Sequence, residues 1–217
     1  MEIHPPALVR VPKGGRALEL RPPSPRDAPA LIEAIEASLP ELRRFMPWAH
    51  ADNTVEQQYT RLVGIQRDYW GEGDKVFHVW EGPRMLGCFG MHARTLNARG
   101  YELGYWVRSD AAGQGVATTI ARALVIVGVE HFGLERVQVM YNAANLASAR
   151  VAEKCGFQIE GRMQSFETAP TAAQLAGGRT EARVTVMTAL LRDQARALSW
   201  YAPLRERLEI LDWREIV

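Results

Sequence analysis

Hydrophobic residues follow two different periods along this chain, and each period predicts a kind of element. Alternating or short apolar runs are typical of strands, and they cover residues 17–21, 75–81, 84–94, 100–108, 136–140, 158–167 and 182–191. Apolar residues at helical spacing, with Ser24, Thr54 and Asn145 as expected N-caps, predict helices over residues 25–37, 55–70, 116–131 and 146–155.

The remaining segments carry turn residues and little periodicity. Residues 1–16 contain three prolines and a Gly-Gly pair, so we expect a loose N-terminal arm. Residues 39–48 are expected to be a connector and residues 170–178 a loop. The main domain is expected over residues 17–191, followed by a partly helical tail over residues 192–217.

The order of the predicted elements indicates the fold class. Three consecutive strands are followed by a strand–helix–strand crossover, and a crossover of this kind joins parallel strands. We therefore expect an α/β (α+β) fold with a mixed, mostly antiparallel sheet, one parallel strand pair and flanking helices.

One junction in this pattern predicts chemistry. Residues 101–118 read YELGYWVRSDAAGQGVAT, in which a strand runs through a glycine turn directly into a helix. The free N–H groups of a helix N-terminus and the helix dipole favour an anion, most often a phosphate. A tight turn without a ligand is the structural alternative. The context excludes a Rossmann fingerprint, because three hairpin-like strands precede the turn, and the absence of GKS or GKT excludes a P-loop.

The composition of the chain limits the classes of binding partner that we expect. The 217 residues are 47% hydrophobic and 24% charged, and 26 basic side chains nearly balance 25 acidic ones, for a net charge of +1. This balance gives no field that would attract nucleic acid or an anionic membrane. No apolar run is long enough to span a bilayer and no signal-peptide core is visible, so a cytoplasmic protein is expected.

Cysteine and histidine give no metal signature. The two cysteines, Cys88 and Cys155, lie among small and apolar residues and are expected to be packed thiols. The five histidines are scattered, with no helical spacing between them and no HExxH pattern. We therefore expect no metal.

Four segments together resemble the GNAT acetyltransferases, and within them the RimJ/RimL group. AGQGVA at residues 112–117 is similar to the family's phosphate turn, although Ala112 stands where Gln or Arg is expected. LRRFMPW at 42–48, YELGYWV at 101–107 and NLASARVAEKCGF at 145–157 are similar to three further segments of the group. The resemblance covers about residues 17–191 and implies that the parallel strands 100–108 and 136–140 splay apart.

The resemblance implies acetyl-coenzyme A as the co-substrate. Its pyrophosphate is expected to bind the backbone N–H groups of the turn. Its pantetheine arm is expected to pair with the preceding strand, and the N-cap residue of the later helix is expected to make one further contact with the cofactor. These expected binding residues are Gly113, Gln114, Gly115, Val116, Ala117 and Thr118 in the turn, Tyr105, Trp106 and Val107 in the strand, and Asn145 at the N-cap.

Two residues are expected to do the chemistry. Glu102 lies on a strand between apolar neighbours, where a partly shielded carboxylate can act as general base; a charge on a solvated edge is the alternative. The resemblance implies that Ser148 protonates the departing coenzyme A thiolate, whereas by position it is a serine at a helix start. Tyr141 is a second candidate acid.

The resemblance also implies the acceptor, an amine that is most often the N-terminal α-amine of a protein. Trp48, Phe45 and Trp70 are candidates for the acceptor pocket, with core packing as the alternative for Trp70. A small amine, amino acid or antibiotic as acceptor, and a coenzyme A-binding protein without turnover, remain alternatives. The apolar residues of the tail are expected to cover the sheet or a partner subunit, the latter in a homodimer.

Overall fold

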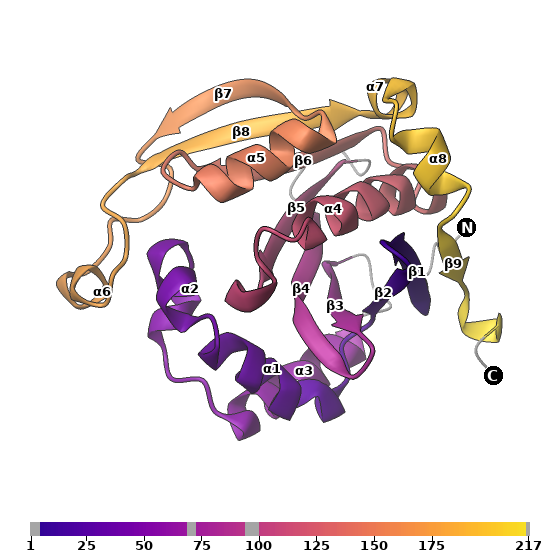
Figure 1. The fold of residues 1–217 in the computed structure, drawn as a ribbon. Coiled ribbons are helices and arrows are strands. Elements are labelled where there is room, and N and C mark those ends of the chain that lie inside the picture. The colour runs from indigo at the N-terminus through magenta and orange to yellow at the C-terminus, as the bar shows by residue number, and fades with distance from the viewer. Residues whose placement is uncertain (1–4, 69–72, 94–99, 216–217) are drawn as a thin grey trace.

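The computed structural model describes residues 5–68, 73–93 and 100–215. Trp70 and the expected turn at residues 97–99 lie outside these ranges. The described strands form one twisted sheet in the order β7-β8-β6-β5-β4-β3-β2-β1-β9 (Figure 1). The strands are β1 Leu8–Lys13, β2 Arg16–Arg21, β3 Lys75–Glu81, β4 Arg84–Ala93, β5 Gly100–Val107, β6 Arg136–Asn142, β7 Gln158–Gln164, β8 Val184–Leu191 and β9 Glu209–Leu211.

Helices flank both faces of this sheet (Figure 1). The α-helices are α1 Ala28–Glu36, α2 Leu39–Phe45, α3 Val55–Asp68, α4 Val116–Ile126, α5 Leu146–Cys155, α6 Ala172–Ala176, α7 Arg192–Ala197 and α8 Tyr201–Arg205. Short 3₁₀ turns occupy Pro25–Asp27, Pro47–His50, Ser109–Ala111 and Trp213–Glu215, and a π-helical turn, Val127–His131, extends α4.

The strand pairing confirms the predicted fold class. Neighbouring strands are antiparallel except for β5 and β6, which are parallel. These two strands pair only at Gly100↔Arg136, Tyr101↔Val137 and Glu102↔Gln138. Both strands continue beyond this point without pairing to each other, so they splay apart as the resemblance implied.

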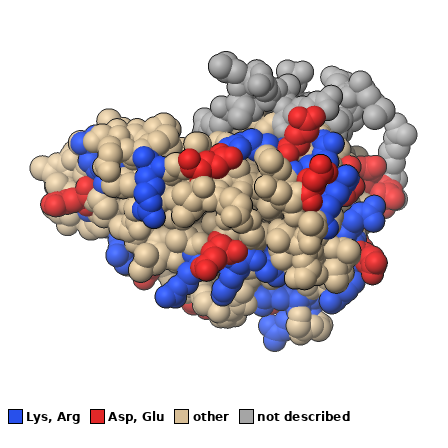
Figure 2. Space-filling view, turned by 90° about the horizontal axis from the view of Figure 1, so that it is seen from above, with Lys and Arg blue, Asp and Glu red and all other residues tan. Residues whose placement is uncertain are grey.

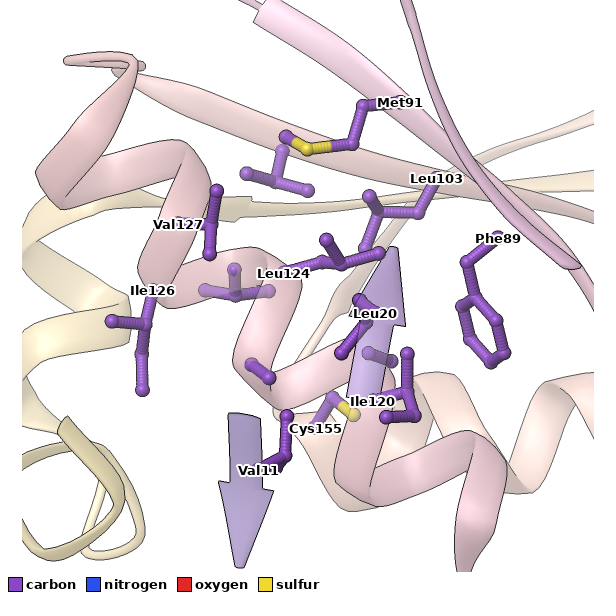
Figure 3. Close-up of a cluster of buried hydrophobic side chains, with 14 of the residues drawn as sticks. Val11, Leu20, Phe89, Met91, Leu103, Ile120, Leu124, Ile126, Val127 and Cys155 are labelled. Carbon is purple, nitrogen blue, oxygen red and sulfur yellow. The ribbon is translucent and has the colours of Figure 1, made fainter. Parts of the chain in front are cut away.

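One face of the sheet, which we call the α4 face, carries the larger core. Ile120, Leu124 and Val127 recur along α4 and its π-helical extension at helical spacing. They pack against Phe89 and Leu103 of β4 and β5, and all five side chains are essentially inaccessible to solvent (Figure 3). Each buried side chain of this size contributes about 1.5–3 kcal/mol of transfer free energy. This core fixes α4, and therefore its N-terminus, against the middle of the sheet.

The opposite face, the α1 face, is covered by α1, α2 and α3 and has a smaller core. Leu31 and Ile35 of α1 pack with Leu42 of α2 and Leu62 of α3, and Trp106 of β5 lies against this cluster. Successive residues of a strand point to opposite faces. Trp106 is therefore on the α1 face, together with Gly104 and Glu102, while Tyr105 and Leu103 are on the α4 face.

Local rules placed the ends of α5 correctly. The Asn145 side chain accepts a hydrogen bond from Ser148 N at 3.1 Å, so Asn145 is the N-cap. Gly156 ends the helix in a left-handed conformation, with φ of +90°. Phe157 N donates to Ala152 O at 3.0 Å, which closes the expected Schellman motif.

Three expectations about irregular segments are wrong. The N-terminal arm contains strand β1, which pairs with β2 and β9. The connector at residues 39–48 is helix α2 followed by a 3₁₀ turn. The loop at residues 170–178 contains α6, which begins with a capping box at Thr171 and Gln174. Strand pairing in β1, core packing of Leu42 in α2 and the cap of α6 override segments that are rich in proline or small residues.

The tail packs on its own domain. Its strand β9 pairs with β1, α8 lies beside α4, and α7 lies against α8 and β8 (Figure 1). Trp200 covers the Arg122 guanidinium at 5.1 Å from the ring centroid, and the buried Tyr201 donates to Glu130 Oε1 at 2.9 Å. The tail therefore holds α4 from outside.

Candidate active site

The glycine turn between β5 and α4 has the geometry of an anion site. Gly113 and Gly115 have φ of +74° and +79°, a conformation that residues with a side chain rarely adopt. The first backbone hydrogen bond of the helix runs from Thr119 N to Gly115 O at 2.9 Å. The N–H groups of Val116, Ala117 and Thr118 precede it, so they have no acceptor within the helix and point out of its N-terminus.

A buried arginine holds this turn in place. The Arg108 guanidinium donates two hydrogen bonds to Glu33 of α1, at 2.8 and 2.9 Å, and two to Asp110, at 2.7 and 3.2 Å. It also donates to Met85 O of β4. Hydrogen bonds to these two carboxylates raise the pKa of Arg108, so the charge is fixed. The end of β5 is thereby tied to both α1 and β4, just before the glycines.

The splay brings one predicted catalytic residue into contact with a binding residue. Ser148, in the first turn of α5, lies 3.0 Å from the hydroxyl of Tyr105 on β5 (Ser148 Oγ to Tyr105 Oη). Tyr105 had been assigned only a backbone role. Removal of the phenol from water raises the pKa of Tyr105, which keeps its proton in place. The pair therefore forms a neutral hydroxyl couple on the α4 face of the splay.

Glu102 occupies the other face, at the closed end of the splay. It lies opposite His92 of β4 and Gln138 of β6 in the sheet register, so these three side chains share the α1 face. Glu102 and Ser148 are consequently not neighbours: the structure places them on opposite sides of the splayed strands.

The register reveals an Asp–His pair that sequence reasoning missed. His92 Nδ1 lies 2.6 Å from Asp74 Oδ2, just before β3, and Asp74 Oδ1 accepts from Ala93 N. The two residues are far apart in sequence and show no motif spacing. The only sequence signal is the alternation of Gly90 and His92 on one strand, opposite Gly104 and Glu102 on the next.

The candidate acceptor residues lie on the same α1 face. Trp48, in the turn after α2, is 38% exposed, and its ring centroid lies 6.2 Å from that of Trp106. Phe45 is half-buried at the end of α2. Trp70, the third candidate, is outside the described residues.

The long β7–β8 connection reaches the same region. Thr180 N, after α6, donates to Arg44 O of α2 at 3.1 Å, and Gly177 packs on the His50 ring. The segment after α6 thus contacts the end of α2 and the turn that follows it, and α6 is drawn near α2 at one edge of the α1 face (Figure 1).

One face of the molecule shows no single-sign patch of charge. Basic and acidic side chains are interspersed on the face seen in Figure 2. Among the described residues, no helix has the length and apolarity needed to cross a membrane. Within the same part of the chain, His, Cys, Asp and Glu side chains form no group of three that could hold a metal ion.

A family model and several known proteins match this chain. The model described as an acetyltransferase (GNAT) domain matches residues 17–158, well over half of the chain. Over 140 residues the chain is 25% identical to "Putative ribosomal N-acetyltransferase YdaF" of Bacillus subtilis strain 168. This match covers 64% of this chain and 76% of YdaF.

The fold matches solved structures over most of its length. One is RimJ of Mycobacterium smegmatis in complex with a coenzyme A disulfide, with a TM-score of 0.77, 21% identity, and coverage of 95% of this chain and 99% of that one. Another is RimL, a ribosomal L7/L12 α-N-protein acetyltransferase, in complex with coenzyme A. It has a TM-score of 0.73 and 20% identity, and the match covers 85% of this chain and 99% of the RimL chain.

Proposed function

This chain belongs to the GNAT acetyltransferase family, and from that premise we propose that it acetylates the N-terminal α-amine of a protein. It is an acetyl-coenzyme A-dependent N-acetyltransferase of the RimL/RimJ kind. The observation that carries the finer proposal is the likeness, across nearly the whole fold, to RimJ and to the α-N-protein acetyltransferase RimL.

The glycine turn fits the cofactor that this family uses. Bound acetyl-coenzyme A supplies an activated acyl group and a thiolate that can leave. The N–H groups of residues 113–118 would hold its pyrophosphate, because fixed donors at a helix N-terminus offset the dehydration of the anion. The glycines at 113 and 115 leave room for close approach, and Asn145 caps the helix beside the splay.

The unpaired backbone of the splay would hold the pantetheine arm. Beyond Glu102, the side of β5 toward β6 pairs with no strand among the described residues, so the main-chain groups of Tyr105, Trp106 and Val107 are the candidates for this contact. An amide arm that pairs with a strand edge gains hydrogen bonds without a dedicated side-chain pocket.

The two hydroxyls on the α4 face suit the departure of the thiolate. Ser148 would donate its proton to the sulfur as the acyl–sulfur bond breaks, and the Tyr105 hydroxyl would stabilise the serine oxygen. On the α1 face, Glu102 would help to remove the proton of the acceptor amine. Acid and base then act from opposite sides of the splay.

The chemistry of the acceptor favours an α-amine. An α-amino group has a pKa of about 7.7–8.0 and a lysine about 10.4, so roughly a tenth of the first is neutral at pH 7 and far less of the second. Trp48 and Trp106 offer an aromatic surface on the acceptor side that could contact the first residues of a peptide.

The test is a panel of acceptors offered to the enzyme with acetyl-coenzyme A. We expect a peptide with a free N-terminus and no lysine to be acetylated faster than the same sequence with a blocked N-terminus and one lysine. Release of coenzyme A gives the rate and mass spectrometry the position. Turnover of a polyamine or amino acid alongside inert peptides would replace this proposal with the small-amine alternative.

A further inference from the structure

The row of polar side chains at the closed end of the splay contains more chemistry than Glu102. We propose that His92, oriented by Asp74, is the group that takes the proton directly from the acceptor amine, with Glu102 beside it. The inference rests on the proposed function, because it names a further catalytic residue for that reaction.

The imidazole of His92 lies over the sheet at a position where two neighbouring strands each carry a glycine. A Cβ atom on Gly90 would be 2.5 Å from His92 Nε2, and one on Gly104 would be 3.1 Å away. These glycines face each other across β4 and β5. Glycine inside a strand weakens the strand and often marks a close approach. Here the group that approaches the backbone is the ring of His92. It packs on both glycines, and a side chain at either position would collide with it.

The position of the His92 ring relative to the splay brings it close to the opening between β5 and β6. The last paired position of β5 and β6 is Glu102↔Gln138, and Gly104 is the second residue beyond it. His92 Nε2 therefore lies over the stretch of β5 that is released from β6. Its side chain is 24% exposed, so an amine arriving on the α1 face can reach it.

Asp74 decides which ring nitrogen is the base. At 2.6 Å, the carboxylate accepts the proton of Nδ1, so the lone pair of the neutral ring is on Nε2. A base whose other nitrogen is held by a carboxylate keeps its tautomer and orientation during proton transfer. Glu102, opposite His92 on the same face, adds a second negative charge that stabilises the imidazolium once it forms.

A second Asp–His pair in the chain shows what a structural pair looks like. His78 Nδ1 lies 2.7 Å from Asp27 Oδ2, but the His78 side chain is only 1% exposed. Asp27 Oδ2 also accepts from Ser24 N and closes a capping box. That pair caps the 3₁₀ turn that precedes α1, whereas the His92 side chain remains partly exposed.

The protons and bonds balance. His92 Nε2 accepts one proton from the acceptor ammonium or from the nitrogen after attack, and the new bond joins that nitrogen to the acetyl carbon. The acyl–sulfur bond breaks, and the thiolate receives a proton from Ser148. The nitrogen gives its second proton to water as the amide forms, and the Ser148 oxygen takes a proton back from water. The imidazolium then returns its proton to water, so one proton is released for each acetylated ammonium.

The experiment compares His92→Gln with Glu102→Gln in turnover of a peptide with a free α-amine, and measures coenzyme A binding by calorimetry. We expect His92→Gln to lower kcat by about 10²–10⁴-fold, the range for a general base, with unchanged coenzyme A affinity. Glu102→Gln should lower kcat less, because it leaves the imidazole in place.

Rescue separates chemistry from folding. His92→Ala leaves space over Gly90 and Gly104, so added imidazole should restore part of its activity; His78→Ala, the matched control, should gain nothing from imidazole. Full kcat in His92→Gln, or equal losses in both variants without rescue, would overturn the inference and leave α-amine acetylation standing. If the wild type uses only small amines, the proposed function fails, and the same variants assayed with that amine still decide the role of His92.

Discussion

The α4 face and the α1 face of the sheet are built from very different lengths of chain. On the α4 face, the glycine turn, Tyr105 and Ser148 come from two short contiguous segments, residues 101–118 and 142–157. On the α1 face, Asp74, His92, Glu102 and Trp48 come from four separate elements that only the sheet register brings together. We infer that the first face binds the cofactor through backbone geometry, and the second recognises the acceptor through side chains.

The largest expected effect comes from blocking the backbone site. Gly115→Glu places a side chain and a negative charge where the pyrophosphate would bind, and like charges in contact cost several kcal/mol. We expect coenzyme A affinity to fall about a thousandfold or more by calorimetry. Gly15→Glu is the matched control, because Gly15 has φ of +80° and open space around it in the β1–β2 turn.

The Gly15→Glu control separates the effect of backbone strain from the effect of blocking the phosphate site. Both variants force a side chain into the left-handed region and add the same charge. If Gly15→Glu loses coenzyme A binding as Gly115→Glu does, the effect is global destabilisation. If Gly115→Glu keeps wild-type affinity, the turn is not the phosphate site.

The next effect concerns the hydroxyl couple on the α4 face. Ser148→Ala should lower kcat about a hundredfold, the lower end for a general acid, because the Tyr105 hydroxyl remains near the sulfur. Coenzyme A affinity should change little. Stopped-time assays of coenzyme A release decide this, and an unchanged kcat would transfer the role of acid to Tyr141.

Tyr105→Phe should have a smaller effect with a distinctive pH dependence. We expect kcat to fall about tenfold, the loss of one hydrogen bond to the reacting serine. Desolvation raises the pKa of Tyr105, so the phenol stays protonated in both neutral and mildly alkaline assays. The ratio of wild-type to variant kcat should therefore be the same at about pH 7 and about pH 9; a ratio that shrinks at alkaline pH would mean that the phenol ionises.

On the α1 face, Trp48→Ala should act on the acceptor alone. The Trp48–Trp106 contact and its exposed ring suggest an aromatic interaction worth about 0.5–1.5 kcal/mol to a bound peptide. We expect the peptide KM to rise about three- to tenfold and the KM for acetyl-coenzyme A to stay the same. An equal rise in both would break the separation between the two faces.

The last prediction is that the buried thiol of Cys155 does not react with an alkylating reagent in the folded protein. Burial raises the pKa of the Cys155 thiol, in the α5 layer, to about 12. Its thiolate fraction at pH 8 is therefore lower than that of a free cysteine by roughly a thousandfold. In a Cys88→Ser background, we expect no alkylation of native Cys155 in a mass-spectrometric time course and full alkylation after unfolding.

The sequence predicted the α4 face well because its signals are local. Glycines that need positive φ, an N-cap at Asn145 and a Schellman end at Gly156 are all set by near neighbours in the chain. The parallel pair and its splay followed from element order and the family resemblance. The predicted irregular segments were wrong where distant partners decide, as in β1, which pairs with a strand about two hundred residues later.

The α1 face could not be predicted in the same way. His92 and Asp74 become a pair only through the β3–β4 register, and Glu102 joins them through the β4–β5 register. A lone histidine in a strand gives no signal of its own. The same is true of Arg108, whose partners Glu33 and Met85 lie on other elements. Such contacts depend on tertiary geometry rather than on spacing along the chain.

The separation of the two faces is the central claim, and one measurement tests it directly. The variant Trp48→Ala/His92→Gln removes side chains only from the α1 face. By calorimetry, its affinity for coenzyme A should remain within about twofold of wild type, because independent sites are additive to about 0.3–0.5 kcal/mol, although its peptide turnover is lost. A fall in coenzyme A affinity comparable to the loss of turnover would contradict the account and show that both faces bind the cofactor as one site.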